Sequence, residues 1–239
     1  MQASEIITRA ARLLGLSSAD VLADAALLDE FLGYANDAVR SIERHGPWRW
    51  LMAEAAITTT SGVETIDLPA DFAALQVGSD IFAADGNWGR LCLVEPLHML
   101  HLRSQTPSSG RPAYYSPIFE PNELLWRLQL WPKPDAAIGL RVPYRRRVAA
   151  MADTTERPQI PEELHELAAI GAAAEAEEQR EKVQAGSQRA KFAGMLAQAW
   201  TEHSTPVTDQ RPIRLSRIGD ERSLADRFRD QPITINVTS

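Results

Sequence analysis

Two histidines and a glutamate lie close together in the segment EPLHMLH. Glu95, His98 and His101 are residue types that bind zinc or iron, and histidines three positions apart share one face of a helix. Zinc peptidases use the spacing His-Glu-x-x-His, which is absent from this chain. The segment leaves two interpretations, a metal-dependent hydrolase site or a short amphipathic connecting helix with partly exposed histidines. The pattern favours the second.

A Glu-x-x-His spacing formed by Glu162 and His165 begins the segment EELHELAAIGAAAEAEE. Di-iron helical bundles place such a pair on each of two helices, and this sequence has no second copy. Acidic side chains also suit the first turn of a helix, because they complement its positive end. We therefore interpret Glu162, His165 and Glu166 as a solvated first turn.

No enzyme motif is found elsewhere in the sequence. It contains no Gly-x-Gly-x-x-Gly, no phosphate-loop lysine and no Gly-x-Ser-x-Gly. Cys92 is the single cysteine, so it forms no internal disulfide, and we interpret it as a small buried apolar residue. The residues predict a protein that is not an enzyme and has no cofactor and no metal.

Arginines lie within two segments, ELLWRLQLWP and IGLRVPYRRRV, whose side chains alternate between two faces with the period of a strand. The intervening PKPDAA predicts a turn, and so a hairpin over residues 124–148. Pro143 lacks an amide hydrogen, which favours an edge strand. The hairpin would carry a possible charged contact face for nucleic acid or an acidic neighbour, or else an edge strand protected by charge. This face comprises Arg127, Arg141, Arg145 and Arg147.

Helical periodicity at both ends of the chain encloses a region with strand periodicity. Apolar positions three and four apart predict helices over residues 3–15 and 24–44, and again after Pro161. The inward face of that later helix contains Gly171, which would let another helix approach closely. Between these helices, AITTTSGVETIDLP predicts a hairpin that turns at Ser61 and Gly62.

These elements predict an α+β fold made of four segments. Residues 1–47 and 153–204 would supply the N- and C-terminal helices of one bundle. Residues 48–152 would form an antiparallel, β-rich insertion, and residues 205–239 an extended C-terminal arm. Trp48 and Trp50 would lock the bundle onto the insertion at a joint completed by Phe72.

Composition excludes several classes of protein. The chain has 239 residues, 44% of them hydrophobic, and a net charge of −7. An acidic surface disfavours tight binding of a phosphate backbone, since that affinity comes from lysine and arginine. The N-terminus does not resemble a signal peptide, and no apolar run reaches the roughly 18 residues that span a membrane. We therefore expect a protein that is intracellular when made and has no membrane partner.

The order of several motifs resembles that of bacteriophage head–tail adaptor proteins, also called head-to-tail connector or head-completion proteins, which include the tail tubular protein A type. The similarity covers about residues 5–200. It is carried by GPWRWL, TTTSGVETIDLPADF, RPAYYSP, LWRLQLWPKPDAAIGLRVPYRRR and PQIPEELHELAAIGAAAEAEE.

The resemblance implies a structural virion protein at the head–tail interface, assembled in the host cytoplasm. Family members typically form a ring of twelve copies beneath the portal, receive the tail or the next connector, and let DNA pass without sequence recognition. Similar adaptors dock on the portal through a C-terminal segment. In this chain that segment would use Arg211, Ile213, Leu215, Ile218, Leu224, Phe228, Ile233 and Ile235.

Other functions stay open at this stage. A different tail or ejection component of the virion could share the same architecture. A nucleic-acid-binding module based on the arginine strand and a metal-dependent hydrolase based on the histidine segment are further alternatives.

Overall fold

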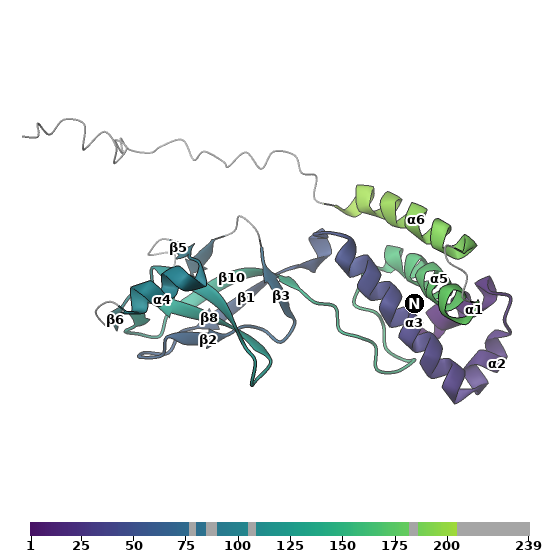
Figure 1. Ribbon diagram of the computed structural model, residues 1–239, viewed down its shortest axis with the longest axis horizontal. Helices are drawn as coiled ribbons and strands as arrows, with labels where there is room; N and C mark the ends of the chain where they lie inside the picture. The colour runs from purple at the N-terminus through teal and green to yellow at the C-terminus, as the bar shows by residue number, and fades with distance from the viewer. Residues whose placement is uncertain (77–79, 85–89, 105–108, 182–185, 205–239) are drawn as a thin grey trace, which may run out of the picture. The chain divides into compact units, whose positions relative to one another are not determined.

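The computed structural model describes residues 1–76, 80–84, 90–104, 109–181 and 186–204, which belong to one compact unit (Figure 1). Helices from the two ends of this unit pack together, and a mixed sheet is formed by the residues between them. The predicted α+β class is confirmed. The predicted arm at residues 205–239 lies outside the described residues.

The helical part consists of α1 (Ala3–Leu13), α2 (Ser18–Ala23), α3 (Ala25–His45), α5 (His165–Glu181) and α6 (Ser187–His203). The N-cap side chains of α2 and α3 accept from backbone amides: Ser17 accepts from the amide of Asp20, and Asp24 accepts from the amides of Ala26 and Leu27. Helix α5 packs against α1, α3 and α6, and Figure 1 shows it between α6 and α3. It is therefore the central helix of this group.

Small residues let α5 take this central place. Its side chains from Leu167 to Ala174 are buried, and most of them are alanines. Gly171 faces both neighbours, because a Cβ atom built there would lie 2.8 Å from the Cβ of Ala38 in α3 and 2.8 Å from Cε2 of Phe192 in α6. The predicted close helix approach at Gly171 is confirmed.

Tyr34 in α3 is a buried phenol with one polar partner. Its hydroxyl donates to Glu30 Oε1 at 2.5 Å, and burial together with this bond raises the pKa of Tyr34 from 10.0 to about 12. Because the folded pKa is the higher one, the stabilisation is complete below pH 10 and is lost as pH rises towards 12. We expect the free energy of unfolding to fall less steeply between pH 10 and 11.5 in Tyr34→Phe than in the wild type. Urea titrations at several pH values measure both slopes, and equal slopes would contradict this account.

The sheet contains eight strands. Seven follow the order β1-β10-β4-β5-β7-β8-β2, and β3 pairs with β10 beside this path. Its strands are β1 (Met52–Thr58), β2 (Thr65–Asp67), β3 (Phe72–Leu75), β4 (Ile81–Ala83), β5 (Arg90–Leu93), β7 (Tyr114–Glu120), β8 (Leu125–Trp131) and β10 (Gly139–Arg146). Strands β5 and β7 run parallel and the other pairs are antiparallel, so the expectation of a purely antiparallel insertion was wrong.

Shorter elements complete the unit. Strands β6 (Ser109–Gly110) and β9 (Lys133–Pro134) form a separate parallel pair, and helix α4 (Pro96–Ser104) contacts β7 and β8. The 3-10 helices η1 (Arg49–Leu51) and η2 (Glu162–Leu164) precede β1 and α5.

Both hairpins predicted from the sequence were wrong, because their strands do not pair with each other. Strand β1 pairs with β10 and β2 pairs with β8, so the turn at Gly62 connects strands that do not pair with each other. Likewise β8 pairs with β7 and β2, whereas β10 pairs with β1, β3 and β4. Strands that are consecutive and paired are instead β7 and β8, closed by the turn at residues 121–124, and β4 and β5.

Pro143 lies in an interior strand, which corrects the expected edge position. Its carbonyl accepts from the amide of Gln76 at 3.4 Å, so its ring nitrogen also faces the side of β3 and β4. On that side β4 pairs with Leu140 and Arg141, and β3 pairs from Tyr144 onward. An amide hydrogen at this position would therefore point between the β10–β4 and β10–β3 ladders, where no strand needs a donor.

Two separate apolar cores result. One contains the buried faces of the helices together with Trp48, Leu51, Val148 and Met151. The other lies within the sheet and includes Phe72, Leu128, Leu140 and Tyr144. No helix in the described ranges is long and apolar enough to cross a membrane.

Candidate interaction surfaces

Glu95, His98 and His101 all lie on the exposed side of the α4 region. They line an open hollow of about 680 Å³ together with Leu97, Leu100 and Ser104. Within the residues that the structure covers, no group of three histidine, cysteine or acidic side chains is placed to hold a metal ion. Met99 faces inward and is fully buried, and the histidines are exposed, as the favoured interpretation expected. The expected amphipathic character is weak, because Leu97 and Leu100 are exposed on the outer side as well.

His165 is buried, which corrects its assignment to a solvated first turn. Its Nδ1 lies 2.7 Å from the amino group of Met1, and its Nε2 lies 3.2 Å from the carbonyl oxygen of Ile160. Burial is the main cause that lowers the pKa of His165, followed by the positive charge of the amino terminus. Because α5 is central in the bundle, even its first turn is covered by neighbouring segments, while Glu162 stays exposed.

Cys92 is exposed, so the expectation of a buried thiol was wrong. In strand β5 its neighbour Leu91 points to the sheet core, and alternation places Cys92 on the opposite face.

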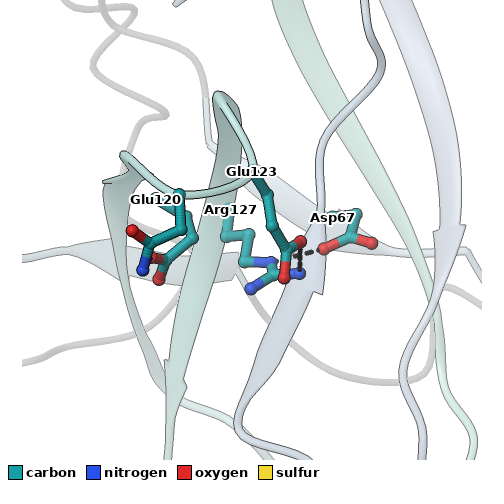
Figure 2. Close-up of polar contacts among 5 residues, drawn as sticks. Asp67, Glu120, Glu123 and Arg127 are labelled. Carbon is teal, nitrogen blue, oxygen red and sulfur yellow. Dashed lines mark hydrogen bonds and ion pairs between the residues drawn. The ribbon is translucent and has the colours of Figure 1, made fainter.

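Arg127 on β8 binds carboxylates from two directions (Figure 2). Its Nε donates to Asp67 Oδ1 on β2 at 2.6 Å, and its Nη2 donates to Glu123 Oε2 in the hairpin turn at 2.5 Å. The bond to Asp67 is the main cause that raises the pKa of Arg127. The arginine therefore ties the β7–β8 turn to β2 and is not a free cation.

The other three arginines of the predicted contact face belong to β10 and the residue after it. Arg141 lies 3.5 Å from Glu54 on β1, Arg145 has a buried Nε without a hydrogen-bond partner among the described residues, and Arg147 is exposed. Since β8 and β10 are not neighbours, the four arginines do not share one hairpin. A role for them in contacting a partner stays a prediction.

The structure separates the three residues expected at the joint. Trp48 is fully buried in the helical core, where its Nε1 donates to the carbonyl of Ile42 at 2.6 Å and its ring lies 5.0 Å from that of Trp200. Trp50 packs beside it, 6.2 Å between ring centroids. Phe72 instead lies in the sheet core, against Tyr144.

The turn of the β7–β8 hairpin carries exposed apolar side chains that the sequence analysis did not single out. Leu124 is 75% exposed and has φ of +54°, and Phe119 is 47% exposed. The segment EPNE contains the proline and asparagine typical of turns, and this signal was available in the sequence.

The residues assigned to portal docking lie outside the described part of the chain. They comprise Arg211, Ile213, Leu215, Ile218, Leu224, Phe228, Ile233 and Ile235.

The described residues thus form helices from both ends of the unit packed together, with a mixed sheet between them. The family model of the SU10 adaptor protein matches residues 1–216, so this chain belongs to that family. It is a structural adaptor component of a bacteriophage virion. No curated protein matches the chain.

Proposed function

We propose that this chain is the head-to-tail adaptor that forms a ring, with twelve copies, between the capsid portal and the tail. The observation that carries the proposal is the family match over residues 1–216, most of the chain. In the ring, one face would bind the portal and the other would receive the tail or the next connector. DNA would pass through the lumen.

The charge of the chain supports a channel through which DNA slides. Its net charge is −7, so acidic groups outnumber basic ones, including arginines such as Arg44 and Arg147 that form no ion pair within the described ranges. Arg127 and Arg141 of the sheet are paired with carboxylates. Weak affinity for phosphate keeps DNA mobile, because tight binding would come from unpaired basic groups that release counterions. The ring would therefore pass DNA without sequence recognition.

The segments of the chain would divide this work. Residues 1–47 and 153–204 would form the helical body and residues 48–152 the β-rich insertion. Residues 205–239 would dock on the portal, since they alternate arginine with isolated Ile, Leu and Phe and contain too few apolar residues to build a core of their own.

Co-purification with the portal protein of the same genome tests the proposal. We expect the full-length chain to elute with the portal as one complex, and a chain that ends at Ser204 to elute alone. A full-length variant with Ile213→Asp, Leu215→Asp and Ile218→Asp should behave like the truncated chain if the apolar side chains make the contact. Full-length protein that does not bind the portal would contradict the proposed position in the virion.

A further inference from the structure

The β7–β8 hairpin presents an apolar tip held in a costly conformation. We call residues 119–124, with Asp67 and Arg127 beside them, the hairpin tip. Leu124 has φ of +54°, a left-handed conformation that is unfavourable for a residue with a side chain. The Leu124 side chain is 75% exposed, so it packs little against the rest of its own chain. This conformation closes the hairpin turn and leaves Leu124 exposed near Phe119, which is 47% exposed, so the tip offers two apolar side chains to another surface.

The same tip has an excess of negative charge. Figure 2 shows Asp67, Glu120 and Glu123 around the single guanidinium of Arg127. Arg127 binds two of these carboxylates, and Glu120 accepts a weak hydrogen bond from Asn122 Nδ2 at 3.4 Å. The tip is therefore acidic and apolar at once, and it repels phosphate.

A basic surface surrounds the end of α3 and the end of β10. The Glu43 side chain accepts from the amide of Val148 at 3.4 Å, which brings the neighbouring Arg44 and Arg147 into one region. Arg49 precedes Met52, and Met52 is the partner of Arg145 across β1 and β10. We call this region the joint surface. Its arginines are Arg44, Arg49, Arg145, Arg146 and Arg147.

The joint surface has an excess of positive charge. Arg44, Arg49 and Arg147 are exposed, and none of them forms an ion pair within the described ranges. The acidic groups in this region already have other partners: Glu43 binds Val148, and Asp71 accepts from the Tyr144 hydroxyl at 2.9 Å. These arginines are therefore available to acidic groups from outside the chain.

We propose that the hairpin tip of one copy binds the joint surface of a second copy. The two surfaces are opposite in charge and come from different elements of the chain, so the contact is heterologous and repeats from copy to copy. Leu124 would pack against the half-buried ring of Trp50, which lies on the joint surface in η1. This inference rests on the proposed ring and identifies the residues that would join its subunits.

Charge reversal on each surface tests the contact in full-length protein by sedimentation velocity, alone and with the portal. The tip variant carries Glu120→Lys and Glu123→Lys, and the joint variant carries Arg49→Glu and Arg147→Glu. We expect each variant alone to self-associate at least about tenfold more weakly than the wild type. An equimolar mixture, and a chain with all four substitutions, should recover association, because acidic and basic surfaces again meet.

Control variants separate this contact from effects on folding or on net charge. Glu163→Lys with Asp29→Lys changes the net charge as the tip variant does, and Arg157→Glu with Arg12→Glu changes it as the joint variant does. Both pairs alter exposed groups of the helical part and should leave association unchanged. Leu124→Gly removes the apolar side chain at a positive φ that glycine adopts freely, so it should leave the folded chain as stable or more stable while weakening association.

Each outcome decides the inference. Variants that associate like the wild type, a mixture that does not recover, or a wild type that stays monomeric both alone and on the portal would overturn it. A joint variant that loses affinity for duplex DNA while association is unchanged would assign the joint surface to nucleic acid. If charge-swapped chains recover association but wild type does not bind the portal, the contact stands and the proposed function fails.

Discussion

Replacing Trp48 with alanine is expected to lower the free energy of unfolding by about 3–5 kcal/mol, the usual range for a buried tryptophan. Trp48 is fully buried and fills the space between the end of α3, Trp50 and Trp200 of α6. Its Nε1 donor to Ile42 is also lost. Guanidinium denaturation followed by circular dichroism at 222 nm measures the change.

A less drastic substitution separates packing from hydrogen bonding at the same position. Trp48→Phe keeps an aromatic ring near Trp200 and removes the donor to Ile42, so it should cost less than Trp48→Ala. Trp200→Ala, at a half-buried residue, provides the second corner of a double-mutant cycle. A Trp48→Ala chain within about 1 kcal/mol of the wild type would be inconsistent with a core built around this ring.

Replacing Gly171 with leucine is expected to abolish the native packing of α5. Even one added carbon at this position would lie 2.8 Å from Ala38 of α3 and from Phe192 of α6, closer than carbon atoms pack. Overpacking costs about 1–3 kcal/mol for small additions, and leucine adds four carbons between two helices. We expect no cooperative thermal transition, or a greatly lowered Tm, in calorimetry.

Gly33 provides a matched control for the effect of glycine on helix stability. It lies in α3 with open space around its Cα atom, so Gly33→Ala should raise the free energy of unfolding by up to about 1 kcal/mol. Gly171→Ala gains the same propensity but loses more through contact with Ala38 and Phe192. Adding Phe192→Leu should recover part of this loss. Stabilisation of Gly171→Ala alone would show that α3, α5 and α6 do not meet so closely.

The helical part of the fold could be predicted because its signals are local. Apolar spacing marked residues 3–15 and 24–44 close to the observed α1 and α3, and the small residues of α5 indicated a close helix contact. Helix α3 ends at His45, directly before Gly46 and Pro47, two residue types that favour the end of a helix. Gly46 is extended and not left-handed, with φ of 179°, and a Cβ atom there would meet the ring of Trp200.

Strand pairing could not be predicted because it is set by contacts far apart in the sequence. The turn at Gly62 has the chemistry of a hairpin, and Gly62 does have a positive φ, yet β1 pairs with β10 more than 80 residues away. Alternation within each strand states which side chains share a face, but it does not say which strand lies next to it. Pro143 was assigned to an edge strand for the same reason, because the sequence does not show which strands lie beside its own.

The candidate surfaces were predictable only in part for a related reason. The arginines of β8 and β10 were visible in the sequence. Their carboxylate partners Asp67 and Glu54 could not be predicted, because they lie on strands whose pairing the sequence does not reveal. The burial of His165 and of Cys92 was also predicted wrongly. Residue type favoured an exposed histidine and a buried cysteine, whereas their positions in α5 and β5 bury His165 and expose Cys92.

Native mass spectrometry of the chain co-expressed with its portal protein would show whether the chain forms a ring on the portal. We expect one complex in which twelve copies of this chain are bound to a portal ring, and loss of those copies when the chain ends at Ser204. A portal without bound adaptor, or adaptor bound as isolated single copies, would contradict a head–tail ring.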